Sequence, residues 1–290
     1  AYPLVNTEKG RFPGHFTAKF EVSEALPRLV SIKAGTKVNV VPGKARAAVE
    51  GFAMTALEAA AAETEKETGI HFDFEADGTF TAVTATGVGA HASTPEVGNN
   101  ALTGLLAFLG KLDFAACPQI DMVRKAAALI PHGDVNGNTL GVFMEDELSG
   151  KMTLSFNMLT VDAGSLDGEF DSRVPVCGND ENVLEVVRSR MAEQGITLLN
   201  KAMIPPHHVS EDSHFVKTLL KAFETYTGRK GECQAMGGGT YVHDLKNGVA
   251  FGAAMPETDN KMHGPDEFAV LDELVVSAKI FAQAIVDLCG

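Results

Sequence analysis

The sequence GVGAHASTPEVGNNA, residues 87–101, decides how this chain is organised. A strand-like run enters it, and an apolar pattern with helical spacing leaves it. Within it, the Ser-Thr-Pro step predicts a helix start, with Thr94 as the N-cap and Pro95 as the first helical residue. Because its neighbours are small, His91 would project from this turn as a substrate-facing imidazole. The alternative for a lone loop histidine is a solvated position without chemistry.

The composition excludes several classes of partner. Of the 290 residues, 45% are apolar and 21% are charged, which is typical of a soluble globular protein of one large domain or two. The net charge is −14 and no basic stripe is present, which argues against nucleic acid and anionic membranes as partners. No apolar run approaches the roughly 18 residues that span a bilayer.

The cysteines and the N-terminus bear on the compartment and on completeness. The four cysteines are scattered without CxxC or Cys/His spacing, which predicts isolated thiols in a reducing compartment. The first residues show no signal-peptide pattern, so we expect a cytoplasmic protein. Ala1 is not an initiator Met, and residues 2–6 already have a strand pattern. We therefore expect a fragment or a processed product.

Residues up to about 204 predict two similar blocks of strands and helices. In the first block, the strands are 2–6, 17–22, 28–33, 38–41, 45–52, 72–74 and 79–86, and the helices are 53–68 and 101–112. In the second block, the helices are 121–130 and 180–194, and the strands are 141–145, 151–161, 169–174 and 197–203. Two such blocks indicate two similar α+β halves that pack their helices on one face of an antiparallel sheet.

Beyond Pro205-Pro206 the pattern changes to α/β. Helices are expected at 213–227, from Tyr241 and at 272–288, with strands at 232–235 and 248–254. Gly238, Gly239 and Thr240 would lie at a strand-to-helix junction, where free N–H groups suit an anion or a carboxylate. A tight structural turn explains these glycines equally well.

Other candidate residues lie at strand ends and in loops. Arg173 ends a strand before a proline and could hold a carboxylate bidentately, or simply pair with a neighbouring acid at the surface. Asn39 could donate its amide to a ligand or cap a turn. His263 lies in a loop beyond an apolar strand, a position that suits a metal ligand. His132 is expected at the surface. His243 could approach a site from the helix after the glycines, but we expect it to be exposed.

Together these residues resemble the co-catalytic zinc peptidases of the ArgE/DapE/carnosinase type, and most of all the PepV-like dipeptidases. The matching pieces run in the family's order along essentially the whole chain: Tyr2-Pro3-Leu4, Glu8-Lys9-Gly10, Asn39 to Pro42, residues 87–101, Arg173-Val174-Pro175, residues 237–241 and 249–253, and the His263 loop. Each piece is weak alone, but the ordered set is specific.

The resemblance implies a fold and a set of roles. The fold would be an α/β catalytic-domain portion (1–12 and 205–290) plus an α+β lid domain (13–204) built of two similar sheet-and-helix halves. His263 would bind one of two zinc ions, with Mn or Co as substitutes, and His91 would stabilise the oxyanion. Asn39, Arg173, Gly238, Gly239 and Thr240 would hold a dipeptide or short peptide. The double lid implies a monomer.

The same resemblance predicts that the chain is incomplete. Such enzymes carry an N-terminal half that supplies an HxD metal motif, a Glu-Glu pair and a further Asp. We expect that half to be missing here, with no HxD and no Glu-Glu anywhere in the chain. One histidine cannot hold two zinc ions, so the chain alone should be inactive. The alternatives are an N-acyl-amino-acid deacylase of the same superfamily and a non-catalytic binding module.

Overall fold

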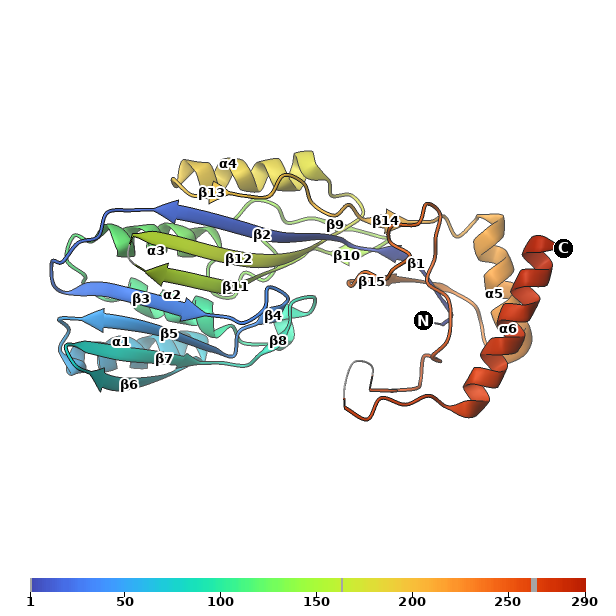
Figure 1. Cartoon of the computed structure of the whole chain (residues 1–290), viewed down its shortest axis with the longest axis horizontal. Helices are drawn as coiled ribbons and strands as arrows, with labels where there is room; N and C mark the ends of the chain where they lie inside the picture. The colour runs from blue at the N-terminus through green and yellow to red at the C-terminus, as the bar shows by residue number, and fades with distance from the viewer. Residues whose placement is uncertain (1, 163, 262–264) are drawn as a thin grey trace. The chain divides into compact units, whose positions relative to one another are not determined.

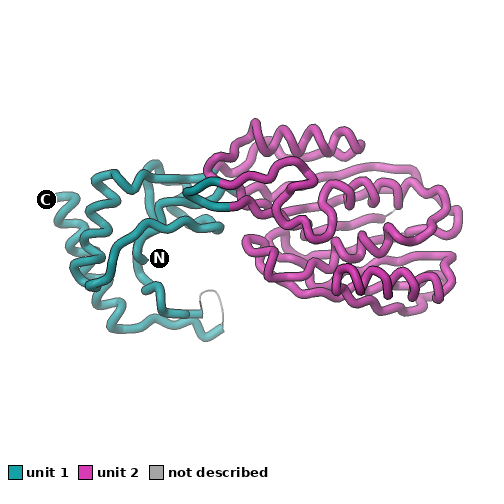
Figure 2. Tube along the Cα trace, turned by 180° about the vertical axis from the view of Figure 1, so that it is seen from behind, with its two compact units in different colours: residues 1–10, 146–150, 206–290 teal, residues 11–145, 151–205 magenta. Residues whose placement is uncertain are grey.

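The computed structural model describes residues 2–162, 164–261 and 265–290. They form two compact units, coloured separately in Figure 2. Unit 1 comprises Ala1–Gly10, Asp146–Gly150 and Pro206–Gly290, and unit 2 comprises Arg11–Glu145 and Lys151–Pro205. The mixed α/β content expected from the sequence is confirmed.

Unit 2 is built on one eight-stranded sheet (Figure 1). The strand order is β13 (Thr197–Leu198), β2 (Gly10–Lys19), β12 (Ser165–Val174), β11 (Thr153–Asp162), β3 (Arg28–Ala34), β5 (Lys44–Glu50), β7 (Phe80–Thr86) and β6 (His71–Asp77). The two predicted sheet-and-helix blocks therefore share a single sheet, joined where β11 pairs antiparallel with β3. That pairing covers only Leu159 to Val161, so the first part of β11 has no β3 beside it.

Helices cover one face of this sheet. They are α1 (Met54–Thr68), α2 (Ala101–Gly110), α3 (Pro118–Leu129) and α4 (Glu185–Glu193), the last preceded by a π-helical turn, η2 (Asp180–Leu184). The first three lie behind the sheet in Figure 1 and in front of it in Figure 2. Inward side chains alternate with outward ones along the strands, so a continuous apolar core forms between sheet and helices.

Aromatic rings and glycines interlock in the core of β2 and β12. Phe12 and Phe16 flank Gly14 on the inward face of β2, and the Phe170 ring lies directly over Gly14. In return, the Phe16 ring lies over Gly168. Phe12 and Phe170 meet edge to face, with ring centroids 5.2 Å apart. Each glycine leaves the space that a ring from the neighbouring strand fills.

Local signals explain the best-predicted elements. The Ala/Glu-rich α1 ends at Gly69, which has φ 70° and donates its N–H to the Glu65 carbonyl. Strands β6 and β7 form the predicted hairpin around a tight turn in which Gly78 has φ 64°. Two further short pairs are β9 (Glu145–Asp146) with β10 (Gly150–Lys151), and β4 (Val40–Val41) with β8 (Ala90–His91).

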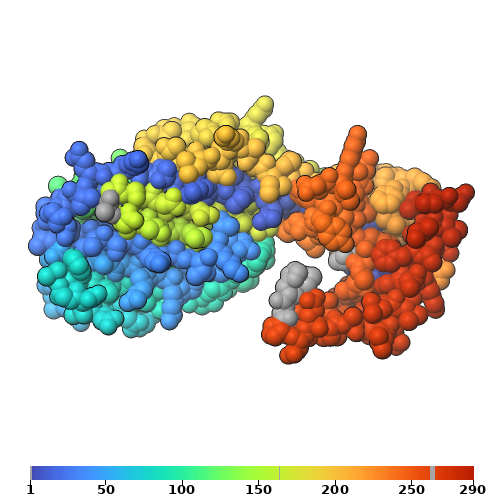
Figure 3. All heavy atoms as spheres, in the orientation of Figure 1, coloured from blue at the N-terminus to red at the C-terminus, as the bar shows by residue number. Residues whose placement is uncertain are grey.

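Unit 1 contains a three-stranded sheet and two helices. Its strand order is β14 (His207–His208), β1 (Leu4–Glu8) and β15 (Cys233–Met236), with β1 parallel to β15 and antiparallel to β14. All five residues of β1 are buried. The helices α5 (His214–Thr227) and α6 (Leu271–Cys289) pack together, and α6 lies at the surface in Figure 3. None of the described helices is long and apolar enough to cross a membrane.

Two predicted elements of unit 1 are wrong. The residues after Tyr241 form successive turns instead of a helix, with Asn247 at φ 61°. The apolar run 248–254 contributes only an isolated bridge, between Ala250 and Val5. Apolar residues alone favoured a strand there, but the bridge on Val5 leaves the rest of the run without a continuous partner.

Candidate functional site

Two of the predicted site residues, Asn39 and His91, lie side by side in unit 2. The short strands β4 and β8 pair antiparallel, with Val40 opposite His91. The chain continues this contact, because the Ala92 N–H donates to the Asn39 carbonyl at 3.0 Å. Asn39 and His91 are 52 residues apart in the sequence, and the pairing of β4 with β8 brings them together.

The hydrogen bonds of His91 fix its tautomer. Its Nδ1 lies 3.2 Å from the Ser93 backbone N–H, which can only donate, and 2.7 Å from the Ser93 hydroxyl. Nδ1 is therefore the acceptor, and the neutral ring carries its proton on Nε2. The side chain is exposed, and no described residue hydrogen-bonds Nε2. His91 thus presents an N–H donor to solvent.

The segment that carries His91 is not the helix start expected from its sequence. Residues Pro95–Val97 form a single 3₁₀ turn, η1, and the Thr94 side chain makes no capping bond. The helix begins later, where the Asn100 side chain accepts the N–H groups of Leu102 and Thr103. The Ser-Thr-Pro step placed the helix cap at Thr94. The cap is Asn100 instead, because Asn100 stands directly before the helical residues.

Arg173 is buried, with 3% of its surface exposed, on β12. Its Nε donates to Asp171 Oδ1 at 2.6 Å and its Nη2 to Oδ2 at 3.2 Å. This is a bidentate pair two residues along one strand, and Asp171 is itself fully buried. The alternative considered for Arg173, an ion pair with a neighbouring acid, is present with Asp171, but it lies inside the protein and not at its surface.

In unit 1, Thr240 is held by a buried carboxylate, Glu8, to which the sequence assigned no role in the site. Glu8 is 1% exposed, and its Oε1 accepts the Thr240 hydroxyl at 2.6 Å and the Thr240 N–H at 3.2 Å. Its Oε2 lies 2.8 Å from His243 Nδ1, and the His243 side chain is only 10% exposed. His243 was expected to be exposed, and that expectation is wrong. Glu8 therefore fixes the end of the turn that contains Gly238 and Gly239.

Two more histidines lie near this cluster. His207 stands opposite Glu8 across β14 and β1, and its ring centroid is 5.9 Å from that of His243. His208 Nδ1 lies 2.9 Å from the Thr7 hydroxyl. The Glu-Lys-Gly and Gly-Gly-Gly-Thr motifs signalled both ends of this cluster, but only the fold brings Glu8 to His243, 235 positions away.

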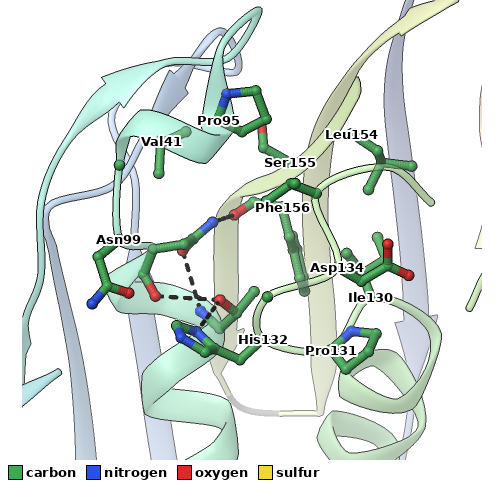
Figure 4. A pocket seen from close by; sticks show the side chains of 15 residues that line it. Val41, Pro95, Asn99, Ile130, Pro131, His132, Asp134, Leu154, Ser155 and Phe156 are labelled. Atoms are coloured by element: carbon green, nitrogen blue, oxygen red, sulfur yellow. Dashed lines mark hydrogen bonds between the residues drawn. The ribbon is translucent and has the colours of Figure 1, made fainter. Parts of the chain in front are cut away.

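A small pocket of unit 2 contains an H-x-D spacing, His132-Gly133-Asp134, so the expectation that the chain has no HxD is wrong. Figure 4 shows His132 and Asp134 at its wall. Burial acts to raise the pKa of the Asp134 carboxyl, but the backbone N–H groups of Thr139 and Asn138 that it accepts outweigh burial and lower this pKa. His132 is half-buried and bonded to the Thr103 hydroxyl at 2.9 Å, and burial lowers the pKa of its ring. Both groups are engaged in local structure.

The predicted metal ligand, His263, lies outside the described residues. Among the residues that are described, no three His, Cys, Asp or Glu side chains come together in a way that could hold a metal ion. The described part of the chain therefore does not by itself provide a zinc site.

Comparison with known proteins gives the family. No protein-family model matches the chain. The chain is 32% identical over 289 residues to a β-Ala-Xaa dipeptidase of Lactobacillus delbrueckii subsp. lactis, covering 99% of this chain and 61% of that protein. It is also 32% identical over 294 residues to a putative dipeptidase of Bacillus subtilis, covering 99% of this chain and 62% of that protein. The chain thus spans about three fifths of the length of these relatives.

A solved structure shares the fold. The aminoacylhistidine dipeptidase of Vibrio alginolyticus aligns with 98% of this chain and 62% of its own, at 13% identity and a TM-score of 0.52. The family expected from the ordered motifs is confirmed. Its homologues are dipeptidases of the M20 peptidase family.

Proposed function

We propose that these 290 residues are the substrate-holding part of a zinc-dependent dipeptidase. Unit 2 would be the lid, and unit 1 would be the C-terminal part of the catalytic domain. The homology to dipeptidases along 99% of the chain supports this assignment. The chain spans only three fifths of those relatives, and its described residues offer no metal cluster, so we propose that it is inactive alone.

The observation that carries the proposal is the state of His91. Its Nδ1 is occupied by Ser93, so Nε2–H is a fixed donor at an exposed position. Attack of water on a peptide carbonyl creates negative charge on the carbonyl oxygen, and a preorganised N–H stabilises that charge in the transition state. Removing one such donor typically lowers the rate by about a hundredfold or more.

The other predicted residues would hold the substrate. Asn39, beside His91, would donate its side-chain amide to the peptide. Arg173 would hold the C-terminal carboxylate, with Asp171 fixing the orientation of its guanidinium. Gly238, Gly239 and Thr240 would line the pocket in unit 1, with the turn fixed by Glu8.

Zinc, with Mn or Co as substitutes, would polarise the carbonyl and activate water. The described residues do not fit a zinc site, so we assign its ligands to His263 and to the part of the relatives' length that this chain does not span. The scattered cysteines favour a reducing, cytoplasmic compartment. We further propose a monomer without nucleic-acid or membrane partners, which light scattering after size exclusion would test.

The test is an assay of the full-length protein against a panel of dipeptides and N-acetyl amino acids. The protein is first stripped with a chelator and then given zinc, manganese or cobalt. We expect metal-restored dipeptide hydrolysis, and a fall in kcat of about a hundredfold for His91→Ala with an unchanged circular dichroism spectrum. The exposed His15→Ala is the matched control.

The panel also separates the alternatives. Hydrolysis of N-acetyl amino acids without dipeptide cleavage would refute the dipeptidase and favour the deacylase. No hydrolysis with any metal would leave the chain as a binding module. The 290-residue chain, assayed in parallel with zinc, should show no turnover.

A further inference from the structure

We propose that Asn100 is a positioning residue for His91, and that it acts with His132 and Asn99 to hold the loop 88–99 in place. The catalytic part of this inference rests on the proposed function. The anchoring part rests on contacts within unit 2 alone.

The loop that carries His91 is closed at its base. Val88 and Asn99 exchange two backbone hydrogen bonds, each of 2.8 Å, so the ends of the loop are paired. One side of the loop pairs with β4 through His91 and Ala90. The position of His91 therefore depends on what holds the base of the loop against the sheet.

Asn100 holds that base by using both ends of its side-chain amide. Its Oδ1 caps α2 by accepting N–H groups of Leu102 and Thr103 at 3.0 and 3.2 Å. Its Nδ2 donates to the Phe156 carbonyl on β11 at 2.8 Å. Phe156 lies on the part of β11 that does not pair with β3. The Asn100 amide therefore gives the Phe156 carbonyl the hydrogen bond that a neighbouring strand would otherwise give it. One side chain thus joins loop, helix and sheet.

His132 and Asn99 complete the anchor from the other side. Asn99 Nδ2 donates to the Thr68 carbonyl at 2.9 Å. His132 Nδ1 is hydrogen-bonded to the hydroxyl of Thr103, in the first turn of α2. Figure 4 shows His132 and Asn99 at the wall of the pocket. Its dashed lines include the bond between His132 and Thr103 of α2 and the bond from Asn100 to Phe156 of β11. The loop is therefore fixed to the end of α1 as well as to β11.

Asn100 caps α2 through its Oδ1 and bonds Phe156 through its Nδ2, so substitutions can separate these two functions. Asn100→Asp keeps a good N-cap but replaces the donor to Phe156 with a carboxylate oxygen. Asn100→Ser keeps a cap without the charge and without the reach to Phe156. Asn179 is the matched control, because its side chain caps η2 through Glu181 and Asn182. Asn179→Asp makes the same chemical change at a cap that carries no such strand contact.

Hydrogen exchange on the 290-residue chain tests the anchor without any activity. We expect backbone amides in 88–101 to exchange about tenfold faster in Asn100→Asp and in Asn100→Ser, with α2 retained by circular dichroism. Asn179→Asp should leave this segment unchanged. Unaltered exchange of 88–101 in both Asn100 variants would overturn the proposal.

The full-length enzyme tests the link to His91. Asn100→Asp should lower kcat about tenfold with KM within about twofold, because a displaced donor weakens transition-state binding. In a His91→Ala background it should have no further effect. Independent, multiplying effects of the two changes would overturn the positioning role. If the wild type cleaves no dipeptide, the proposed function fails, and the exchange result alone then supports or overturns the anchor.

Discussion

Replacing Gly14 by alanine should strongly destabilise unit 2, although the change adds a single methyl group. A Cβ atom at Gly14 would lie 2.0 Å from Phe170 Cζ and 2.1 Å from Cε1, distances at which the ring has to move. The ring is confined, because Phe12 packs edge to face against it and Phe16 lies 6.4 Å away, centroid to centroid.

The magnitude follows from this confinement. Overpacking a close-packed core typically costs about 1–3 kcal/mol, and the directness of this overlap puts the expected loss of unfolding free energy near 3 kcal/mol. Gly110→Ala is the matched control. Nothing lies within 4 Å of a Cβ there, and alanine is the better helix former, so the change should be neutral or stabilise by a few tenths of a kcal/mol.

Urea unfolding followed by circular dichroism measures both variants, and a double-mutant cycle assigns the cause. Phe170→Leu opens a cavity on its own but also makes room for the new methyl. The double variant Gly14→Ala/Phe170→Leu should therefore lose at least about 1 kcal/mol less than the sum of the single losses. A neutral Gly14→Ala, or strictly additive losses, would refute the reasoning.

Three further predictions concern single side chains. Glu8→Ala should lower the unfolding free energy by about 3 kcal/mol, and Glu8→Gln by less because an amide oxygen can still accept from Thr240, as urea titrations would show. Burial lowers the pKa of His132 in the folded chain, so the unfolded chain binds a proton on this ring at a higher pH than the folded chain does. The free energy of unfolding therefore falls as the pH drops below about 6.5 and through the folded pKa. His132→Asn should flatten that part of a stability profile measured from pH 8 to 5, and an unchanged slope would contradict this. Burial raises the pKa of the Cys233 thiol, so mass spectrometry should find it alkylated at pH 8 more slowly than the exposed Cys289, with the two rates converging in urea.

Elements with signals inside their own sequence were predictable. Helix α5 begins at a serine cap, Ser213, and ends at Gly228 with φ 66°, and both residues are visible as helix punctuation. The β6–β7 hairpin has its turn glycine in sequence between two strand patterns. The M20 family was likewise predictable, because its motifs are short, ordered and local.

Features that depend on distant partners were not predictable. The second bond of the Asn100 side chain, to the Phe156 carbonyl on β11, is one such feature, because no local pattern reveals it. Glu8 and His243 meet only because β1 lies at the centre of a sheet whose other strands come more than 200 residues later. The order of the eight strands in the sheet of unit 2 was hidden for the same reason, since strand order is set by tertiary packing.

The edge strand β6 of the eight-stranded sheet affects how molecules associate at high concentration. Strand β6 ends the sheet with a row of backbone groups that could add a strand from another molecule. Its outward side chains include three exposed acids, Asp73, Glu75 and Asp77. A second copy laid against this edge would bring acid against acid, so mutual repulsion keeps the edges apart at neutral pH. Replacing these acids with asparagine and glutamine would remove that repulsion, and concentrated protein would then be open to edge-to-edge assembly.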